Sequence, residues 1–315
     1  MRRQLTTAAI TMLVLSCSVG CATDDLARRA ISPGYSPGKT DLLWYPSGAD
    51  MVKSGRLSLA EVIPAPDKTP LDVWVIKARD ARNQPAPSTG TVVILHELGS
   101  GKGSFPYIGV GERLAKKGYD VVLMDLRAHG RSGGQFITYG GKEKPDVKAV
   151  LDKLIAQKAV SDKVYAFGGN LGASVAIQYA AIDPRCQGVV AIAPYKDFRS
   201  MARLGMPLVS EAEFKRVMEA AGKMGEFTPE EASAVEAAKK LACPLLVIQG
   251  LLDVSVPLDH GKAIYDAAGG PKKLTIVGIE QPILPAFYED WIADQVDSLA
   301  KKGLPAVATS KPAGN

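Results

Sequence analysis

Short runs of apolar, often β-branched residues alternate along this chain with longer segments in which apolar residues recur every three or four positions. Most runs are apolar at every position, as is typical of strands buried on both faces of a parallel sheet. The pattern predicts an α/β fold with a mostly parallel central sheet flanked by helices, in one domain over 56–302. The predicted strands are 57–63, 71–78, 91–96, 120–125, 163–167, 188–193, 244–249 and 273–277.

Helical periodicity fills the segments between these strands. Residues 146–157 illustrate it, with Val147, Val150, Leu151 and Leu154 at helical spacing. Residues 196–242 are helical throughout and predict a small cap inserted into the domain; their Met201, Leu204, Met218 and Met224 either form an apolar cap face or pack the core. The other predicted helices are 107–117, a helix from the turn at 168–172 to residue 181, 258–268 and 286–301.

The first twenty residues have the pattern of an export signal. Arg2 and Arg3 precede an apolar stretch at 8–19 that is too short to span a bilayer. A small residue then precedes Cys21, which resembles a bacterial lipobox with Cys21 as the lipidated residue. The prediction is a lipoprotein signal peptide at 1–20, a tether and N-terminal loop at 21–55, and a disordered tail at 303–315.

Other interpretations of this leader remain open. Cys17 is a second candidate with a shorter apolar stretch, and an ordinary secretory leader with incidental cysteines is the plainer alternative. If Cys21 is lipidated, the protein is anchored on the periplasmic side of the cell envelope. Ala22 directly after the cysteine favours the outer over the inner membrane, by analogy with other lipoproteins.

Composition and charge exclude several classes of function. The chain is 46% hydrophobic and 23% charged, as in ordinary globular proteins, and removing Arg2 and Arg3 from a net charge of +5 leaves +3. No basic run is interleaved with aromatic residues, so a nucleic-acid partner is not expected. Neither a metal-ligand spacing nor a glycine-rich phosphate loop occurs, so the sequence predicts no metal and no cofactor.

Two cysteines of the mature domain precede predicted strands. Cys186 comes before the strand at 188–193, and Cys243 before the strand at 244–249. If these strands are neighbours, the two sulfurs start adjacent parallel strands. A disulfide, which an oxidising compartment would permit, and two free buried thiols both remain open.

A glycine-framed turn follows the strand at 163–167. It reads Gly168-x-Asn170-x-Gly172 and leads into a helix rich in small residues. A buried strand, tight turn and helix start form the context of the G-x-S-x-G elbow, in which a strained turn exposes a nucleophilic serine. Here the central residue is asparagine, whose amide nitrogen is delocalised into its carbonyl and is a very poor nucleophile.

Further motifs follow the carboxyl ends of other strands. H-E-L-G stands at 96–99, D-L-R-A-H-G-R-S-G at 125–133, and G-L-L-D-V-S-V-P at 250–257. With the turn at 168–172, these segments resemble the α/β-hydrolase superfamily from about residue 55 to 302, in particular its serine aminopeptidase-like and esterase-like members. The resemblance implies ester or amide hydrolysis by an ancestor, at a site beyond the carboxyl edge of the sheet.

The same resemblance implies a role for each position. In active relatives a serine attacks a carbonyl, a histidine takes its proton, an acid orients the histidine and backbone N–H groups hold the oxyanion. Asn170 takes the nucleophile position and Asp253 the acid position. Gln281, or Glu280 one residue before it, takes the histidine position. His96, Glu97, Leu171 and Glu280 are the expected oxyanion and pocket residues.

The three histidines do not supply a catalytic base after the last strand. His96 and His129 follow the third and fourth strands and are expected to be structural hydrogen-bonding groups, and His260 follows the acid loop. The segment around Ser132 also fits G-x-S-x-G, but it does not stand between a buried strand and a helix, so Ser132 is rejected as nucleophile. Glu97 replaces a glycine, and a carboxylate there would repel an oxyanion unless it points to solvent.

Three functions therefore compete. The preferred one is a catalytically degenerate α/β-hydrolase-like lipoprotein, a pseudoenzyme that binds a small acyl-like or peptide-like ligand. The second is an active ester or amide hydrolase with non-standard residues, for example deamidated Asn170 or a water activated by Glu280 or Glu97. The third is a structural or partner-binding envelope lipoprotein. Whether the chain is an enzyme, and its oligomeric state, stay open.

Overall fold

The computed structural model describes residues 22–33, 46–278 and 289–304. An eight-stranded sheet runs through them in the order β1-β2-β4-β3-β5-β6-β7-β8. The first two pairings are antiparallel, and every pairing from β4 to β8 is parallel. The strands are β1 (Leu59–Pro64), β2 (Pro70–Ile76), β3 (Thr91–Leu95), β4 (Asp120–Met124), β5 (Val164–Gly169), β6 (Cys186–Ile192), β7 (Leu245–Gly250) and β8 (Lys272–Val277).

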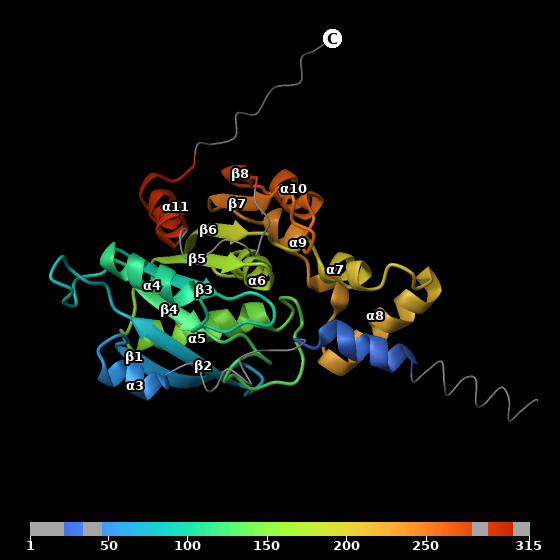
Figure 1. Ribbon diagram of the computed structural model, residues 1–315, viewed down its shortest axis with the longest axis horizontal. Coiled ribbons are helices and arrows are strands. Elements are labelled where there is room, and N and C mark those ends of the chain that lie inside the picture. The colour runs from blue at the N-terminus through green and yellow to red at the C-terminus, as the bar shows by residue number, and fades with distance from the viewer. Residues whose placement is uncertain (1–21, 34–45, 279–288, 305–315) are drawn as a thin grey trace, which may run out of the picture.

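Helices cover both faces of this sheet (Figure 1). On one face α4 packs against α11; on the other α5, α6, α9 and α10 follow one another, each packed on the next. The predicted α/β architecture is therefore confirmed. The helices are α3 (Gly48–Lys53), α4 (Tyr107–Lys116), α5 (Glu143–Ala156), α6 (Leu171–Ala180), α7 (Phe198–Gly205), α8 (Glu211–Gly225), α9 (Ala234–Ala238), α10 (Leu258–Ala267) and α11 (Glu289–Lys302), with a 3-10 turn η2 (Pro229–Glu231).

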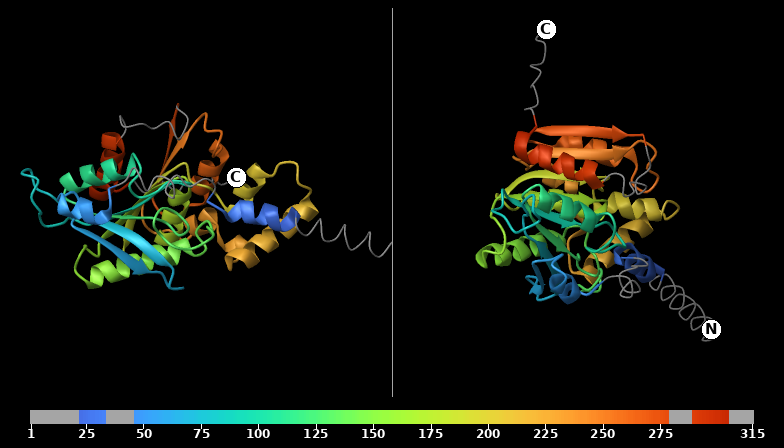
Figure 2. Two further views of the ribbon diagram at one scale, coloured as in Figure 1. Left: turned by 60° about the horizontal axis from the view of Figure 1, so that its bottom comes forward. Right: turned by 60° about the vertical axis from the view of Figure 1, so that its left-hand side comes forward.

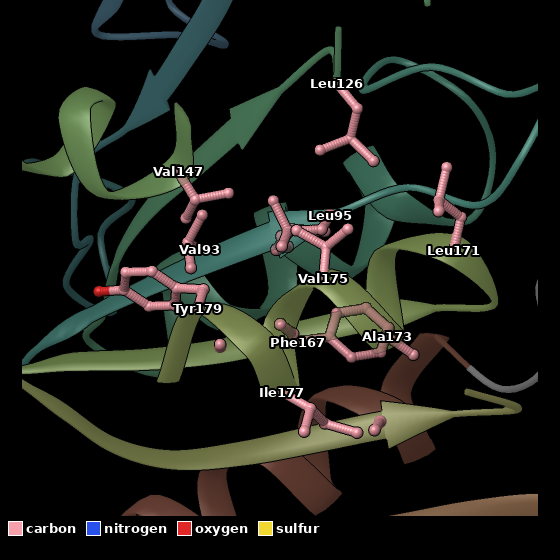
Figure 3. Packing of buried hydrophobic residues seen from close by; sticks show 14 of the residues in the cluster. Val93, Leu95, Leu126, Val147, Phe167, Leu171, Ala173, Val175, Ile177 and Tyr179 are labelled. Atoms are coloured by element: carbon pink, nitrogen blue, oxygen red, sulfur yellow. The ribbon is translucent and has the colours of Figure 1, made fainter. Parts of the chain in front are cut away.

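The central strands owe their position to their continuous apolar runs. Every residue of β3, β4, β5 and β7 is buried, which requires helices on both faces. Helix α6 fills the centre of one face, where its apolar residues pack on β3, β5 and β6. Figure 3 shows this packing, with Phe167 of β5 and Val93 and Leu95 of β3 near the α6 side chains Val175, Ile177 and Tyr179. This packing supports the turn at 168–172, which connects β5 to α6.

The sheet order brings the predicted motifs to one edge. Strands β3, β5, β6 and β7 are consecutive neighbours, so their carboxyl ends lie side by side. The segments that follow them carry Glu97, Asn170, Tyr195 and Asp253 respectively. This edge is where open α/β sheets bind ligands.

Within the predicted insertion at 196–242, α7, α8 and η2 form a cap that projects from one side of the sheet (Figures 1 and 2), whereas α9 packs on α6 and α10. A helix over 22–31 lies alongside α8. The prediction of a tether and loop over 21–55 is therefore wrong for 22–31 and for α3. Ala27 and Ile31 are one helical turn apart and fully buried, so tertiary packing stabilises this helix. The proline, glycine and serine residues that follow it led to the prediction of a loop.

The two cysteines do start adjacent strands, since β6 pairs with β7. Both are free thiols in this structure, so of the two alternatives it adopts the pair of free cysteines. A hydrogen bond between the thiols, together with burial, raises the pKa of Cys186 well above its ordinary value. Among the described residues, no helix has the length and apolar character needed to cross a bilayer.

Candidate functional site

The turn between β5 and α6 has the strained backbone of a nucleophile elbow. Asn170 has φ 54° and ψ −113°, a conformation that L-residues other than glycine rarely adopt. The flanking glycines make the turn possible. A Cβ on Gly172 would lie 2.2 Å from the Leu95 carbonyl oxygen, and one on Gly168 would lie 2.4 Å from the Gly172 carbonyl. The G-x-N-x-G pattern therefore forms a turn with elbow geometry, with an asparagine at its centre.

Two donors hold the side chain of Asn170. Its Oδ1 atom accepts a hydrogen bond from the backbone N–H of Leu171 at 2.9 Å, and another from the hydroxyl of Tyr195. Asn170 is only 9% exposed. In α/β-hydrolases the N–H after the nucleophile is one of the oxyanion-hole donors. In this chain the corresponding N–H, that of Leu171, already donates to the Asn170 side chain.

Tyr195 is a site residue that sequence reasoning missed. It follows β6, and its backbone N–H donates to Ser174 Oγ at 2.6 Å while Ser174 Oγ donates back to the Tyr195 carbonyl at 3.0 Å. Ser174 therefore bonds to the backbone of Tyr195 and holds that residue beside the elbow. Burial raises the pKa of Tyr195 well above its ordinary value, so the hydroxyl stays protonated and donates to Asn170. Its position after the strand beside β5 was the one available signal.

Glu97 and Tyr107 close the side of the site next to β3. The backbone N–H of Glu97 donates to the Tyr107 hydroxyl at 3.2 Å, and a Cβ on Gly169 would lie 2.6 Å from that hydroxyl. The segment after β3 supplies the second oxyanion donor in this fold. Here a tyrosine oxygen occupies one N–H of that segment. Tyr107, at the start of α4, is a second residue that the sequence did not reveal.

The carboxyl group of Glu97 does not lie in open solvent. Glu97 is half-buried, and desolvation raises the pKa of its carboxyl group above the ordinary value. Its charge acts on both Tyr107 and Tyr195, whose pKa values it raises further. A carboxylate thus stands near the place where an oxyanion would form, where negative charge opposes the reaction.

Asp253 keeps the arrangement expected of the acid position. It follows β7, is 5% exposed, and its Oδ1 atom accepts from the backbone N–H groups of Ser255 and Val256, both at 2.9 Å. These bonds form because the Gly250-to-Pro257 loop turns back over the carboxylate. The Asp253 charge adds to the burial that raises the pKa of Tyr195.

The rings of His96 and His129 form hydrogen bonds with backbone groups. His96 Nε2 accepts from the Leu126 N–H at 3.0 Å and Nδ1 lies 2.8 Å from the Glu97 carbonyl. His129 Nε2 accepts from the Gly99 N–H at 3.2 Å and Nδ1 lies 2.9 Å from the Arg127 carbonyl. Burial lowers the pKa of His96 to about 3 and also lowers that of His129, so both rings are neutral. Both connect the loops that follow β3 and β4.

The remaining predicted residues lie elsewhere. His260, near the start of α10, accepts from the Lys196 N–H at 3.3 Å. Ser132 Oγ donates to the Asp125 carbonyl at 2.6 Å and accepts from the Asp72 N–H at 2.9 Å, contacts that stabilise a loop. Gln281, Glu280 and Cys21 fall outside the described residues. Within the described part of the chain, no cluster of three or more His, Cys, Asp or Glu side chains could hold a metal ion.

Comparison with protein families and curated proteins gives two matches. The family model described as serine aminopeptidase, S33, matches residues 86–230, which include the elbow and the start of the cap. The chain is 28% identical over 170 residues to an uncharacterized protein of Bacillus subtilis, YqkD. That alignment covers 50% of this chain and 54% of the relative, so it spans about half of each.

Solved structures share the fold over a larger part of the chain. The Pyrococcus furiosus esterase Pf2001 superposes with a TM-score of 0.63 at 24% identity, covering 79% of this chain and 94% of the esterase. Est1E of Butyrivibrio proteoclasticus, solved with ferulic acid bound, superposes with a TM-score of 0.60 at 18% identity, covering 76% and 97% of the two chains. At these identities the likeness establishes the fold alone. Fold, elbow and family match agree: the chain has the α/β-hydrolase fold and is similar to the serine aminopeptidase, S33, family over residues 86–230.

Proposed function

We propose that this protein is a cell-envelope lipoprotein that uses an α/β-hydrolase fold to bind a small acyl-like or peptide-like ligand without hydrolysing it. The observation that carries the non-catalytic part is the clamped amide of Asn170. Its Oδ1 atom is bonded to the Leu171 N–H and to the Tyr195 hydroxyl. One side chain thus removes the nucleophile and also occupies an oxyanion donor.

The electrostatics of the site support the same conclusion. Hydrolysis of an ester requires a base to activate a nucleophile and donors to stabilise the negative charge that develops on oxygen. Gln281 stands at the histidine position in the sequence, and an amide cannot take up and return a proton near neutral pH. The Glu97 carboxyl group adds negative charge where positive potential is needed.

The retained geometry supports a binding role. A strained backbone at a non-glycine residue costs about 1–3 kcal/mol and persists where the surrounding structure requires it. Asn170 keeps that backbone without a reactive side chain. Since the fold binds ligands at this edge and Est1E holds ferulic acid, a small carboxylic acid or its ester is a reasonable first class of ligand.

The envelope location is part of this proposal. It is supported by the leader, in which Arg2 and Arg3, a short apolar stretch and Cys21 follow one another as in lipoprotein signal peptides. We propose that Cys21 is lipidated and that the protein is anchored on the periplasmic side, on the outer membrane.

The decisive experiment is ester turnover by the purified mature protein on short- and medium-chain nitrophenyl esters, beside Asn170→Ala. We expect no turnover in either protein, or equal traces in both. A rate that the wild type shows and N170A loses would overturn the non-catalytic part of the proposal. Glu112→Gln on the exposed surface of α4 serves as a matched control, because its ion pair with Arg56 lies away from the elbow.

Ligand binding is tested by calorimetric titration with octanoate and ferulate. We expect Glu97→Gln to bind octanoate several-fold more tightly than the wild type, because it removes a like charge from the site. Methyl octanoate, which is neutral, should be unaffected, and E112Q should behave as the wild type. If neither the wild type nor E97Q binds any of these probes at millimolar concentration, the binding part of the proposal is wrong.

The alternative of an active hydrolase with non-standard residues is favoured by one observation, the raised pKa of the half-buried Glu97. A carboxyl group of this kind can act as a general acid or base. Under this alternative E97Q would lose turnover that N170A retains. If Asn170 deamidates instead, mass spectrometry of the peptide that contains it would detect aspartate at that position.

A further inference from the structure

The cap has an exposed apolar surface at its outer end. Helix α7 ends at Gly205 and α8 begins after the N-cap Ser210, and the loop between them is Met206-Pro207-Leu208-Val209. Leu208 is 98% exposed and Leu204, on the last turn of α7, is 43% exposed. Pro207 is exposed as well and Val209 is partly exposed. We call Leu204, Pro207, Leu208 and Val209 the cap-tip patch. Neighbouring exposed apolar side chains can mark a surface that contacts a protein or a membrane.

The N-terminal helix is fixed against the cap along its length. Thr23 Oγ1 donates to the Glu213 carboxylate in the first turn of α8. At the other end, the carbonyl of Ile31 accepts from the Ile137 N–H at 2.9 Å. A Cβ on Gly225, the last residue of α8, would lie 3.6 Å from Ile31 Cδ1. The helix over 22–31 therefore runs parallel to α8, start beside start and end beside end, as Figures 1 and 2 show.

This docking fixes where a lipid on Cys21 would be. Cys21 is two residues before Thr23, and two residues of extended chain span at most about 7 Å. Ser210 Oγ accepts from the Glu213 N–H at 3.3 Å, and Leu208 is two residues before Ser210. Glu213 thus bonds to both Thr23 and Ser210. Cys21 is two residues before Thr23 in the sequence, and Leu208 is two residues before Ser210. An acyl chain on Cys21 would enter the bilayer beside the cap-tip patch.

We infer that the cap-tip patch inserts into the membrane surface next to the lipid anchor. The inference rests on the lipidation of Cys21 in the proposed function and adds the face of the protein that meets the bilayer. The partner of the patch is a lipid surface, because an anchor on Cys21 would keep the patch next to the bilayer. The effective concentration of lipid at the patch would therefore be high. Apolar side chains beside the anchor would add a second, direct contact with the bilayer.

The surrounding charges suit a surface of low net charge. Arg199 and Arg203 both pair with Glu211, and Arg216 pairs with Glu213. These pairs leave little net charge around the patch, so insertion of Leu208 and its neighbours would depend on apolar contact. We therefore expect binding to zwitterionic phosphatidylcholine and only weak dependence on salt.

The test uses the full lipidated protein reconstituted into phosphatidylcholine vesicles, with or without bromine atoms on the acyl chains. Leu208→Trp places a fluorophore in the patch. The matched control is Val62→Trp, at an exposed position of β1 far from the cap, and the wild type supplies the background of the native tryptophans. We expect brominated lipid to quench at least half of the added emission of L208W and none of that of V62W.

Two results would overturn the inference, and they are distinguishable. If mass spectrometry of the Cys21 peptide finds no lipid, the anchor is absent and the proposed envelope function fails with it. If Cys21 carries lipid and the protein floats with the vesicles, but L208W emission is the same in brominated and ordinary lipid, the patch does not enter the bilayer. In that case the anchoring proposal stands and the inference alone is wrong.

Discussion

The hydroxyl of Tyr195 and the backbone N–H of Leu171 donate to one atom, the Oδ1 of Asn170. Tyr195 belongs to the segment after β6, and Asn170 to the turn after β5. A residue that follows the neighbouring strand thus stabilises the side chain at the centre of the elbow. The contact makes the elbow part of the packed structure instead of an exposed reactive turn.

Removing the Tyr195 hydroxyl should destabilise the fold. Tyr195→Phe deletes one buried hydrogen bond while the ring keeps its packing against Tyr139, at 6.0 Å between centroids. We expect the free energy of unfolding in urea to fall by about 1 kcal/mol. Tyr265→Phe is the control and should have little effect, because the Tyr265 ring is partly exposed and contacts the Lys272 ammonium group through its face. Equal unfolding midpoints for Y195F and the wild type would argue against the hydrogen bond.

The strained backbone at Asn170 should make glycine preferable to alanine there. Both substitutions lose the two hydrogen bonds of the amide, but only glycine adopts φ 54° without steric cost. Relief of strain exceeds the entropy that glycine adds to the unfolded chain, so N170G should be more stable than N170A by about 1 kcal/mol. The measurement is the urea midpoint of each variant. A more stable N170A would mean that the turn relaxes out of this conformation.

Gly172 should not tolerate a methyl group. A Cβ there would lie 2.2 Å from the Leu95 carbonyl oxygen and 2.6 Å from that of His96, and backbone cannot move aside as a flexible side chain can. We expect G172A to lose about 3 kcal/mol or more of stability, or to fail to fold. Gly205→Ala is the matched control, because its Cβ would meet nothing within 4 Å. G205A should be neutral or slightly stabilising. Similar losses in both variants would refute the steric argument.

His96 should make stability depend on pH. Burial, followed by the nearby His129, lowers the pKa of His96 to about 3 in the folded protein, against about 6.5 when unfolded. Between these values the unfolded chain binds the extra proton. His96 therefore leaves the free energy of unfolding unchanged above pH 6.5. As the pH falls from 6.5 towards 3, its titration lowers this free energy by about 1.4 kcal/mol per pH unit. The charged groups that act on the ring, Asp125 and Lys102, remain paired with each other.

The measurement is the free energy of unfolding at several pH values between 4 and 6.5 for the wild type, H96Q and the control H260Q. The slope should be shallower in H96Q, which lacks this imidazole. H260Q keeps the contribution of His96 and loses only that of His260, whose pKa burial also lowers, so its slope should stay closer to that of the wild type. The same slope in the wild type and H96Q would show that His96 is not the responsible group.

Much of the fold could be predicted because its signals are local. Uninterrupted apolar runs predicted the buried strands, and helical spacing such as that of Val147 and Val150 predicted the helices between them. The glycines of the elbow were readable for the same reason, since a turn that excludes a Cβ limits its own residues. The sequence also determined that an asparagine stands at the centre of this glycine-framed turn, a matter of residue identity alone.

The tertiary structure decided what depends on residues far apart in the chain. Tyr195 reaches the elbow because β6 pairs with β5, and Tyr107 because α4 begins beside the end of β5. No local pattern in the sequence predicts a hydroxyl that donates to an amide far away in the chain. The helix over 22–31 exists because α8 and the loop at 136–139 bury Ala27 and Ile31, whereas its own short sequence resembles a tether. Periodicity records how each segment meets a core, and only the packed chain shows which segments meet one another.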